Sequence, residues 1–461
     1  MGHLNCWWRP LIAMHLVLDF LYLLGLVLAS PWLIYRSVRS SGWRHFLARL
    51  GFVTAPSGAV WLHGSSVGEV RLIEPLVGLL EQQDLPIIIS SHTPTGVSSA
   101  RRAYPQHFVF RFPFDFSFIQ RRLMARFKPS LIIIVESDLW PNQLLAAESY
   151  GVPVAIVNAK LSERSFRLHR WSRMVPRALR RAALVAAQTD AHADRFQGLG
   201  VPRERIAVTG NMKYDLTVSE TEPSQRAGLR QQFGFAADAC VVIGGSLHPQ
   251  EDEDLLAAFS HSVARQQTAR LVIVPRYPDQ APAVIQNVIQ RGLRAVTKSE
   301  LDDNPGRSVD KDEIIIVDTL GDLRPCYAAA DIAFVGGSLY YRGSNKGGHN
   351  LMEPAILGLP VLFGPHNFSF RETVADLVAA DAGIIVRDRD ELTVALGELV
   401  DSETRRVEMG RRAQQVVIDG QGASERNLEL LLPILDVVRA CRPNPQEAQC
   451  RHQSRTRIAN E

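Results

Sequence analysis

From residue 59 onward, short apolar runs alternate with longer amphipathic stretches. In several runs every position is apolar, as in LIIIV at residues 131–135, which is typical of strands buried on both faces of a sheet. The alternation predicts parallel sheets covered by helices on both faces. The predicted strands are residues 59–63, 86–90, 107–112, 131–135, 153–157, 183–187 and 206–210 in a first set, and residues 240–245, 271–275, 313–318, 332–337, 360–364 and 383–387 in a second.

A polar stretch without periodicity, TVSETEPSQRAG at residues 217–228, separates the two sets and is interpreted as a linker. We therefore expect an α/β protein with two doubly wound, Rossmann-like domains facing a cleft, since ligands of such sheets bind outside the carboxyl ends of the strands. The expected segments are residues 1–50 as a membrane anchor with a basic juxtamembrane stretch, 51–216 as the N-terminal domain, 217–228 as the linker, 229–441 as the C-terminal domain and 442–461 as a disordered tail.

The N-terminal segment is apolar over residues 11–35 except for His15 and Asp19, and about 20 such residues suffice to cross a bilayer. Four arginines follow within residues 36–49 against one before the segment, which favours a cytoplasmic location for the rest of the chain. A cleaved signal peptide is the alternative, although the basic cluster is unusual for export. A carboxylate in hydrocarbon costs roughly 2.5 kcal/mol or more, so Asp19 is expected to be protonated or partnered, or the segment to enter only one leaflet.

Composition excludes several classes of protein. Lys and Arg total 51 against 48 for Asp and Glu, so there is no overall basic field of the kind that binds nucleic acid. The five cysteines lack metal-type spacing, which fits a reducing compartment and predicts no structural zinc. No P-loop, HExxH, GxSxG or GxGxxG pattern is present, which disfavours NTPases, zincins, serine hydrolases and dinucleotide oxidoreductases. We expect neither a metal nor a cofactor.

Glu69 is the first candidate for chemistry. It follows the predicted strand 59–63 in the sequence SSVGEV, with Ser66 and Gly68 before it and a helical apolar pattern after it. This places a carboxylate at the carboxyl end of a strand, where ligands bind. The alternative is that Glu69 only complements a helix dipole, as acids in first helical turns commonly do.

Other predicted strands also end in polar residues. SHTPTG offers hydroxyl and backbone N–H groups to an anion or is ordinary helix-capping sequence, and ESDLWPN and NAKLSERS place charged groups after buried strands. In the second half, GGHNLMEP lets a glycine backbone approach a phosphate at the opening of a helix, with ordinary turn chemistry as the alternative. The candidates are Thr93, Thr95, Gly96, Glu136, Asp138, Lys160 and Arg164 in the first half, and Ser246, His248, Arg276, Gly347, Gly348, His349, Asn350 and Glu353, a possible partner of ribose hydroxyls, in the second.

Together with GNMKYD, PRYP and FGPHNF, these motifs in this order resemble the 3-deoxy-D-manno-octulosonic acid (Kdo) transferases of Gram-negative bacteria, from the N-terminal segment to about residue 432. The resemblance implies a GT-B fold anchored at the cytoplasmic face of the inner membrane. It implies transfer of Kdo from CMP-Kdo to the lipid A precursor (lipid IVA) in lipopolysaccharide biosynthesis. Glu69 resembles the catalytic base, Arg276 and the regions 246–248 and 347–353 resemble the nucleotide side, and other cleft positions are matched by Glu136, Lys160, Arg164, Asn211 and Lys213.

The chain departs from the family pattern in four places. Tyr277 replaces a usual His, Asp138 a usual Glu and Ser369 a usual Asn, and the loop at residues 340–345 is longer than usual. Two alternatives stay open at this point: another GT-B enzyme that uses a UDP-sugar, and a noncatalytic lipid-binding scaffold. The expected partners are the lipid A precursor, CMP-Kdo and an anionic membrane surface.

Overall fold

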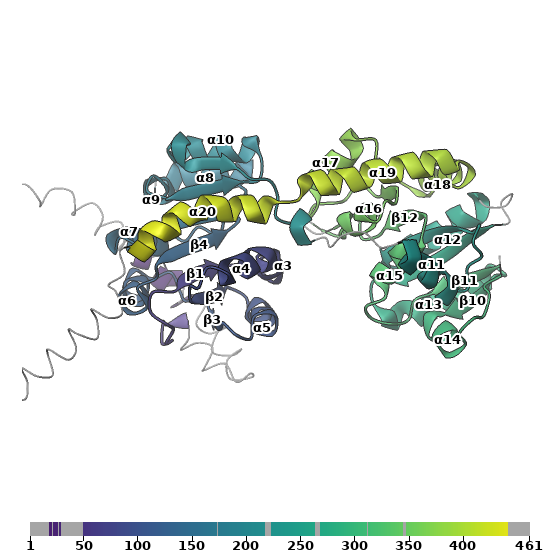
Figure 1. Cartoon of the computed structure of the whole chain (residues 1–461), viewed down its shortest axis with the longest axis horizontal. Helices are drawn as coiled ribbons and strands as arrows, with labels where there is room; N and C mark the ends of the chain where they lie inside the picture. The colour runs from purple at the N-terminus through teal and green to yellow at the C-terminus, as the bar shows by residue number, and fades with distance from the viewer. Residues whose placement is uncertain are drawn as a thin grey trace, which may run out of the picture. The chain divides into compact units, whose positions relative to one another are not determined.

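The computed structural model describes residues 18–20, 22–25, 27–28, 49–172, 174–216, 223–262, 268–310, 312–343 and 347–440 (Figure 1). They form two compact units. The N-terminal unit takes its described residues from Met1–Leu216 and Gln421–Glu461, and the C-terminal unit takes them from Thr217–Gly420.

The N-terminal unit is built on a seven-stranded sheet in the order β3-β2-β1-β4-β5-β6-β7, in which all pairings are parallel. The strand order reverses between β1 and β4, and this is where ligands of doubly wound sheets bind. The strands are β1 (Val60–His63), β2 (Ile87–Ser91), β3 (Phe108–Arg111), β4 (Leu131–Val135), β5 (Val154–Ala159), β6 (Leu184–Ala187) and β7 (Ile206–Val208).

Helices cover both faces of this sheet because its strands are apolar on both sides. Along β1, Val60 and Leu62 face one buried cluster and Trp61 faces the other, as side-chain alternation requires. Helices α6, α7, α9 and α10 pack over the Trp61 face, and α3, α4, α5 and α20 over the opposite face. The helices are α3 (Val67–Leu72), α4 (Glu74–Glu81), α5 (Pro94–Ala103), α6 (Ser117–Phe127), α7 (Pro141–Ser149), α8 (Glu163–Ser172), α9 (Met174–Leu179), α10 (Asp190–Gly198) and α20 (Ala423–Ala440), with the short 3₁₀ turns η1 (Arg203–Arg205) and η2 (Tyr214–Leu216).

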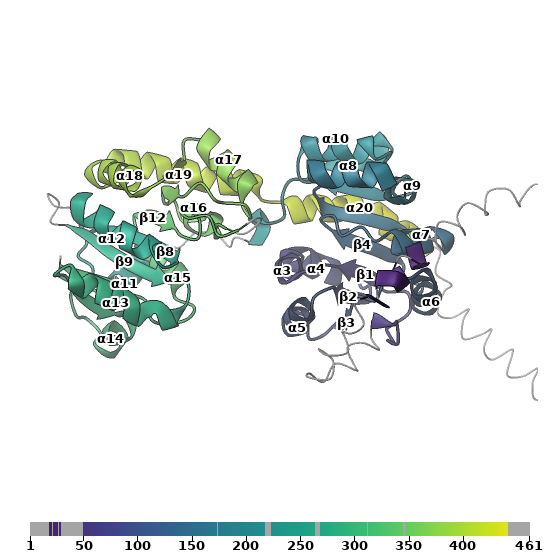
Figure 2. The ribbon, with the colours of Figure 1, turned by 180° about the vertical axis from the view of Figure 1, so that it is seen from behind.

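The C-terminal unit repeats this plan with a parallel sheet in the order β10-β11-β9-β8-β12-β13-β14 (Figure 2). Here the order reverses between β8 and β12. The strands are β8 (Cys240–Leu247), β9 (Ala269–Pro275), β10 (Arg294–Thr297), β11 (Glu313–Ile316), β12 (Ile332–Val335), β13 (Val361–Phe363) and β14 (Gly383–Ile385). The helices are α11 (Pro223–Gln232), α12 (Glu251–Ser262), α13 (Ala281–Gln290), α14 (Lys298–Asp303), α15 (Leu323–Ala329), α16 (Met352–Ile356), α17 (Arg371–Ala379), α18 (Arg389–Asp401) and α19 (Glu403–Gly420), with the 3₁₀ turn η3 (Pro278–Gln280).

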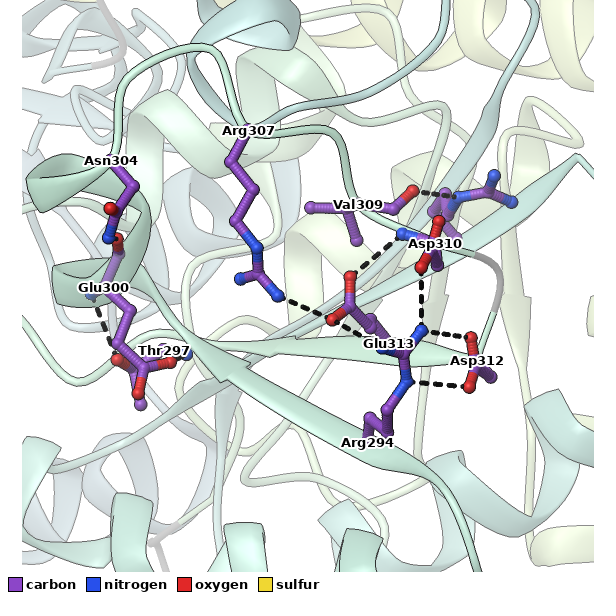
Figure 3. A network of polar contacts seen from close by, with 10 residues as sticks. Arg294, Thr297, Glu300, Asn304, Arg307, Val309, Asp310, Asp312 and Glu313 are labelled. Atoms are coloured by element: carbon purple, nitrogen blue, oxygen red, sulfur yellow. Dashed lines mark hydrogen bonds and ion pairs between the residues drawn. The ribbon is translucent and has the colours of Figure 1, made fainter.

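Strand β10 was not among the predicted strands. It lies at the edge of the sheet, and of its residues only Val296 is buried, so no apolar run marks it. Ion pairs hold its first residue instead: Arg294 contacts Asp312 and Asp310 at 2.8 Å each (Figure 3). These ion pairs of Arg294 lie where β10 and β11 begin, at the edge of the sheet opposite the carboxyl ends of the strands. We therefore assign them a structural role.

Helix α20 corrects the predicted boundary at residue 441. It belongs to the N-terminal unit, where Leu431 and Leu435 are buried against the sheet. Asp215 caps its start by accepting hydrogen bonds from the backbone N–H of Gly422 (2.7 Å) and Ser424 (2.6 Å). The chain therefore crosses between the units twice.

The predicted linker is also shorter than expected. Residues 217–222 lie outside the described residues, but α11 already begins at Pro223. Arg226 and Arg230 of this helix pair with Asp331 of the C-terminal unit at 2.6 and 3.1 Å, so residues from 223 onward are part of that unit. The tail predicted at 442–461 lies outside the described residues.

Most of the predicted anchor also lies outside the described residues, and among those that are described no helix has the length and apolar character to cross a membrane. Residues 18–20, 22–25 and 27–28 are helical. The Asp19 carboxylate is partnered: it accepts hydrogen bonds from the backbone N–H (2.8 Å) and hydroxyl (2.5 Å) of Ser117, the first residue of α6.

Candidate functional site

The loop after β1 holds Glu69 in the first turn of α3. Ser66 has extended backbone angles and is the N-cap of α3, and its hydroxyl oxygen accepts from the Glu69 N–H at 3.4 Å. The Glu69 carboxylate in turn accepts from the Ser65 N–H and hydroxyl at 2.7 Å each and from the Ser66 hydroxyl at 3.3 Å. This is a variant of the capping box, so the helix-capping role considered from the sequence is real. Gly68 is exposed, and a Cβ added there would make only an ordinary contact, 3.8 Å from the Ser66 hydroxyl oxygen.

The environment of Glu69 also suits proton acceptance. Burial raises the pKa of Glu69 above its usual value, and the nearby carboxylates of Glu136 and Asp138 raise it further, against the lowering effect of the Ser65 hydrogen bonds. A carboxylate with a raised pKa accepts a proton more readily than an ordinary one. Capping and proton acceptance are therefore compatible functions of one side chain.

The adjacent strand β4 brings two further carboxylates to the same edge of the sheet. Glu136 follows β4 directly with φ +61°, an uncommon angle for a non-glycine residue, and forms an ion pair with Lys160 at 2.6 Å. Such strained backbone is often found at functional sites. Asp138 lies two residues further on and contacts His63 at 2.8 Å. Three carboxylates thus gather where the strand order reverses.

The SHTPTG motif after β2 serves mainly to start a helix. Thr93 is the N-cap of α5, and its side chain accepts from the Gly96 N–H at 3.0 Å. A Cβ at Gly96 would lie 2.1 Å from the Ser91 hydroxyl oxygen, so any larger residue would have to displace the Ser91 side chain. Thr95 is exposed and donates to the Thr93 hydroxyl at 3.4 Å. Capping chemistry thus accounts for Thr93 and Gly96.

The turn after β7 folds back toward β5, which brings Asn211 and Lys213 toward the other candidates. The Asn158 carboxamide oxygen accepts from the Met212 N–H at 2.9 Å, and Asn158 itself has φ +50° within an irregular part of β5. Arg164, in contrast, is exposed in the first turn of α8.

In the C-terminal unit, β8 ends in an irregular turn that presents Ser246 and His248. Ser246 has φ +56°, and the pairing with β9 shifts between Gly245 and Leu247. A Cβ at Gly245 would lie 2.0 Å from the Tyr327 hydroxyl oxygen, so only glycine fits beneath this turn. The Arg276 N–H donates to the Leu247 carbonyl at 2.7 Å, which joins the loops after β8 and β9.

Glu251 organises this edge and was missed from the sequence. Its buried carboxylate accepts from four backbone N–H groups: Gly337 at 2.7 Å, Ser338 and Leu339 at 3.0 Å each, and His248 at 3.0 Å. It therefore fixes the loops after β8 and β12 to each other. In the sequence it is one of four consecutive acids, of which Asp252 and Asp254 are buried as well, and nothing in that run indicates which one accepts these hydrogen bonds.

His248 and His349 form a direct contact between the loops after β8 and β12. Their Nε2 atoms are 3.2 Å apart and their ring planes differ by 9°, so one ring donates its Nε2–H to the bare Nε2 of the other. Burial lowers the pKa of His349 to about 4, and Arg276, His248 and Arg342 add to this effect. Burial and Arg342 likewise lower the pKa of His248. The neutral pair therefore lies in a field of positive charge that suits an anion.

The two glycines of GGHN are required by packing. Gly347 has φ +135° and Gly348 φ +78°, and a Cβ at either would lie within 2.4 Å of an atom of His366 or Asn367. The helix that follows, α16, spans only Met352–Ile356. A helix of little more than one turn has a small dipole, so anion binding here would depend on the glycine backbone and the nearby arginines rather than on a helix N-terminus.

Asn350 and Glu353 contact each other. The Asn350 carboxamide donates to Glu353 at 3.1 Å and accepts from the Met352 N–H at 3.1 Å. One oxygen of Glu353, Oε1, is thus partnered within the loop.

Three of the four departures from the family pattern lie in the C-terminal unit, in the loops around the histidine pair, and the fourth, Asp138, lies in the N-terminal unit. Tyr277 lies edge-on to the His248 ring at a centroid distance of 6.4 Å and below the Arg276 guanidinium. In the longer loop, the Tyr340 hydroxyl donates to Asp254 and the Tyr341 ring packs against His366. The Ser369 N–H donates to the Gly347 carbonyl at 3.4 Å. Among the described residues, no three His, Cys, Asp or Glu side chains are grouped so as to hold a metal ion.

The family model and the relatives that match this chain carry the same description. Residues 44–216 match the family model described as 3-Deoxy-D-manno-octulosonic-acid transferase (kdotransferase). A 3-deoxy-D-manno-octulosonic acid transferase of Haemophilus influenzae is 32% identical over 413 residues, which cover 87% of this chain and 94% of the relative. The transferase of the same name from Bordetella pertussis is 33% identical over 421 residues, with the same coverage of both chains.

Solved structures support the two-unit α/β fold. A glycosyltransferase from Rickettsia africae aligns with a TM-score of 0.53 at 11% identity, covering 82% of this chain and 99% of that one. HepE from Anabaena, in complex with UDP, aligns with a TM-score of 0.52 at 16% identity, covering 81% and 100%. At such low identity these similarities support only the fold. That fold consists of two parallel-sheet α/β domains and is consistent with GT-B.

Proposed function

Because the chain belongs to the 3-deoxy-D-manno-octulosonic acid transferase family, and is therefore a glycosyltransferase that transfers Kdo in lipopolysaccharide biosynthesis, we propose that it uses CMP-Kdo as donor and the lipid A precursor (lipid IVA) as acceptor. The observation that carries this proposal is the similarity to named Kdo transferases over 94% of their length.

In the proposed reaction Glu69 is the general base. The acceptor hydroxyl gives its proton to the Glu69 carboxylate as its oxygen attacks the anomeric carbon of Kdo, and the bond from that carbon to the CMP phosphate breaks with inversion. General-base catalysis of this kind typically contributes 10²- to 10⁴-fold. The raised pKa of Glu69 and its position where the strand order reverses support this role.

The proposed donor site is the edge of the C-terminal unit that carries Ser246, His248, Arg276 and residues 347–353. Arg276 and Arg342 both lower the pKa of the neighbouring His349, so their charges act at the same place. Charge of this sign would stabilise the CMP phosphate as it leaves. We propose that no metal or other cofactor takes part.

The donor assignment is tested with purified enzyme, lipid A precursor in detergent, and either CMP-Kdo or a panel of UDP-sugars. We expect a product heavier by one or more Kdo residues, detected by mass spectrometry, with CMP-Kdo only. Transfer from a UDP-sugar alone would overturn the donor assignment, and no transfer from any donor would favour a noncatalytic scaffold.

We further propose that the N-terminal segment attaches the enzyme to the cytoplasmic face of the inner membrane, where the amphiphilic acceptor resides. Its described part has two sides. Asp19 bonds to Ser117, and the Tyr22 hydroxyl donates to Asp115 at 3.5 Å. The outward side carries apolar side chains at helical spacing, which suits insertion among lipids: Phe20, Leu23, Leu24, Val27 and Leu28, between 45% and 73% exposed.

Replacing Leu23 and Leu24 together by Ser should weaken binding to anionic vesicles at least about tenfold, because each buried leucine contributes roughly 1.5 kcal/mol or more. Co-sedimentation with phosphatidylglycerol-containing vesicles measures the effect. The matched control is Leu320→Ser, since Leu320 is 86% exposed in the C-terminal unit. Equal binding by both variants would contradict the proposed contact.

A further inference from the structure

A chain of buried polar side chains runs through the core of the N-terminal unit toward Asp138. Trp61 and His63 lie two residues apart on β1 and therefore point to the same face of the sheet, and Ser90 is paired with His63 in register on β2. The Trp61 Nε1–H donates to the Ser90 hydroxyl oxygen at 2.7 Å, that hydroxyl lies 2.8 Å from His63 Nδ1, and His63 Nε2 lies 2.8 Å from Asp138 Oδ2. Trp61, His63 and Ser90 are fully buried.

The groups at the two ends together set the hydrogens of this chain, since the Trp61 indole can only donate and the ionised Asp138 carboxylate can only accept. An indole N–H can only donate, so the Ser90 oxygen accepts from Trp61 and the single Ser90 hydrogen is free to point at His63 Nδ1. Nδ1 then accepts, and the ring hydrogen lies on Nε2, which donates to Asp138. In this arrangement every donor and acceptor of the chain has its partner, and none is left unsatisfied in the core.

The same geometry argues against a proton relay. A relay needs a group at each end that can gain and lose a proton, whereas the Trp61 indole has only a hydrogen to give and lies in the apolar core. The ring of Phe112 packs on His63 at a centroid distance of 4.3 Å, which restricts rotation of the imidazole. This series of hydrogen bonds therefore ends in the core. Its role is to hold Asp138 in one orientation.

Asp138 lies where a substrate can reach it. Its side chain is 24% exposed, and it is close enough to Glu69 to raise the pKa of that residue. Burial alone would raise the pKa of Asp138, but the effects that lower it, of which the His63 hydrogen bond is the largest, outweigh burial and hold the pKa below its usual value. The titratable groups that face Asp138 are His63 from β1, His92 after β2 and Glu69 from α3. His92 is in turn influenced by Arg49 and Arg111.

We infer that Asp138 is a second acceptor-side carboxylate, held by the His63–Ser90–Trp61 chain so that it receives one hydroxyl of the acceptor sugar while Glu69 receives the proton of the attacking one. A sugar carries several hydroxyls, and one additional charged hydrogen bond orients the ring. His63 acts through Asp138 and is a positioning residue. This inference rests on the proposed function, and it identifies the ligand of this edge as a polyhydroxylated ring rather than an acyl chain.

Two substitutions of His63 separate positioning from simple burial. In His63→Gln the amide nitrogen falls near the place of Nε2 and can still donate to Asp138, whereas in His63→Asn the shorter side chain reaches only the Ser90 side. We expect Asp138→Asn to raise the KM for the acceptor about 10- to 100-fold, as loss of a hydrogen bond to a charged group predicts, with the KM for CMP-Kdo unchanged. His63→Asn should raise the acceptor KM in the same direction, and His63→Gln should stay within about threefold of the parent.

The pH profile provides a readout that a purely structural role would not move. Without the Nε2–H donor the pKa of Asp138 rises, so a smaller fraction is ionised at a given pH. The acid limb of kcat/KM for the acceptor then moves to higher pH in His63→Asn but not in His63→Gln. An unchanged acceptor KM in folded Asp138→Asn, or identical profiles for the two His63 variants, would overturn the inference.

If His63→Asn does not fold, Asp138→Asn carries the test, because Asp138 lies at the edge of the unit. Absence of Kdo transfer by the parent enzyme would refute the proposed function itself. Normal transfer by both the parent and Asp138→Asn, with equal acceptor KM, would refute only the role of Asp138.

Discussion

Replacing Glu69 by Gln is expected to lower kcat by about 10²- to 10⁴-fold, because the amide cannot accept the proton of the acceptor hydroxyl. The amide oxygen can still accept hydrogen bonds from Ser65 and Ser66, so α3 should form. Steady-state transfer of Kdo, followed by mass spectrometry of the lipid, measures the effect. In the parent enzyme, activity should fall as pH drops through the pKa of Glu69. Burial raises that pKa, so the fall should begin above the range of an ordinary glutamate.

The control for this experiment is Glu74→Gln. Glu74 is an exposed acid in the first turn of the next helix, α4, so it also complements a helix dipole but is not part of the proposed site. If Glu69 serves only its helix, both variants should show similarly small effects. An unchanged transfer rate in folded Glu69→Gln would remove the assignment of Glu69 as base.

Replacing Glu251 by Ala is expected to destabilise the C-terminal unit by at least about 3 kcal/mol, because it removes the acceptor of three buried backbone N–H groups and of the half-buried His248 N–H, and each unsatisfied buried donor costs roughly 1–3 kcal/mol. Urea unfolding monitored by circular dichroism measures the change. Where the variant is still folded, the KM for CMP-Kdo should rise more than tenfold, since the loops after β8 and β12 lose their common anchor. The acceptor KM should not change.

The control is Glu253→Ala, which removes an exposed acid from the same helix, α12. Loss of charge near the helix N-terminus is common to both variants, so the difference between them isolates the buried contacts. Equal stability of the two variants would contradict the role assigned to Glu251.

The sequence predicted most strands because the physics of a sheet buried on both faces requires continuous apolar runs, as in β4. It did not predict β10, which is mostly exposed and held by the ion pairs of Arg294. It also assigned α20 to the wrong unit. The amphipathic pattern of a helix shows that one face is buried, but not which sheet it is buried against.

Candidate residues could be predicted from the sequence only where polar residues follow an apolar run. Glu69, Glu136 and His248 were identified in this way, and the structure places each at the carboxyl end of a strand. His63 and Glu251 were not identified. The first lies at the end of an apolar run and looks like part of it, and the second is one of four consecutive acids that no local pattern tells apart. Their importance arises from partners distant in the sequence, which no local pattern records.

The return of the chain to its first unit at Gln421 has a practical consequence for dividing this enzyme by protein engineering. The C-terminal unit is continuous in the gene and can be excised as one fragment. A fragment that stops near residue 216, in contrast, lacks the partners of Asp215 and leaves the apolar groove for Leu431 and Leu435 open to water. Such a truncated fragment should aggregate and be poorly soluble unless α20 is added as a separate peptide or fused to the fragment through a short linker.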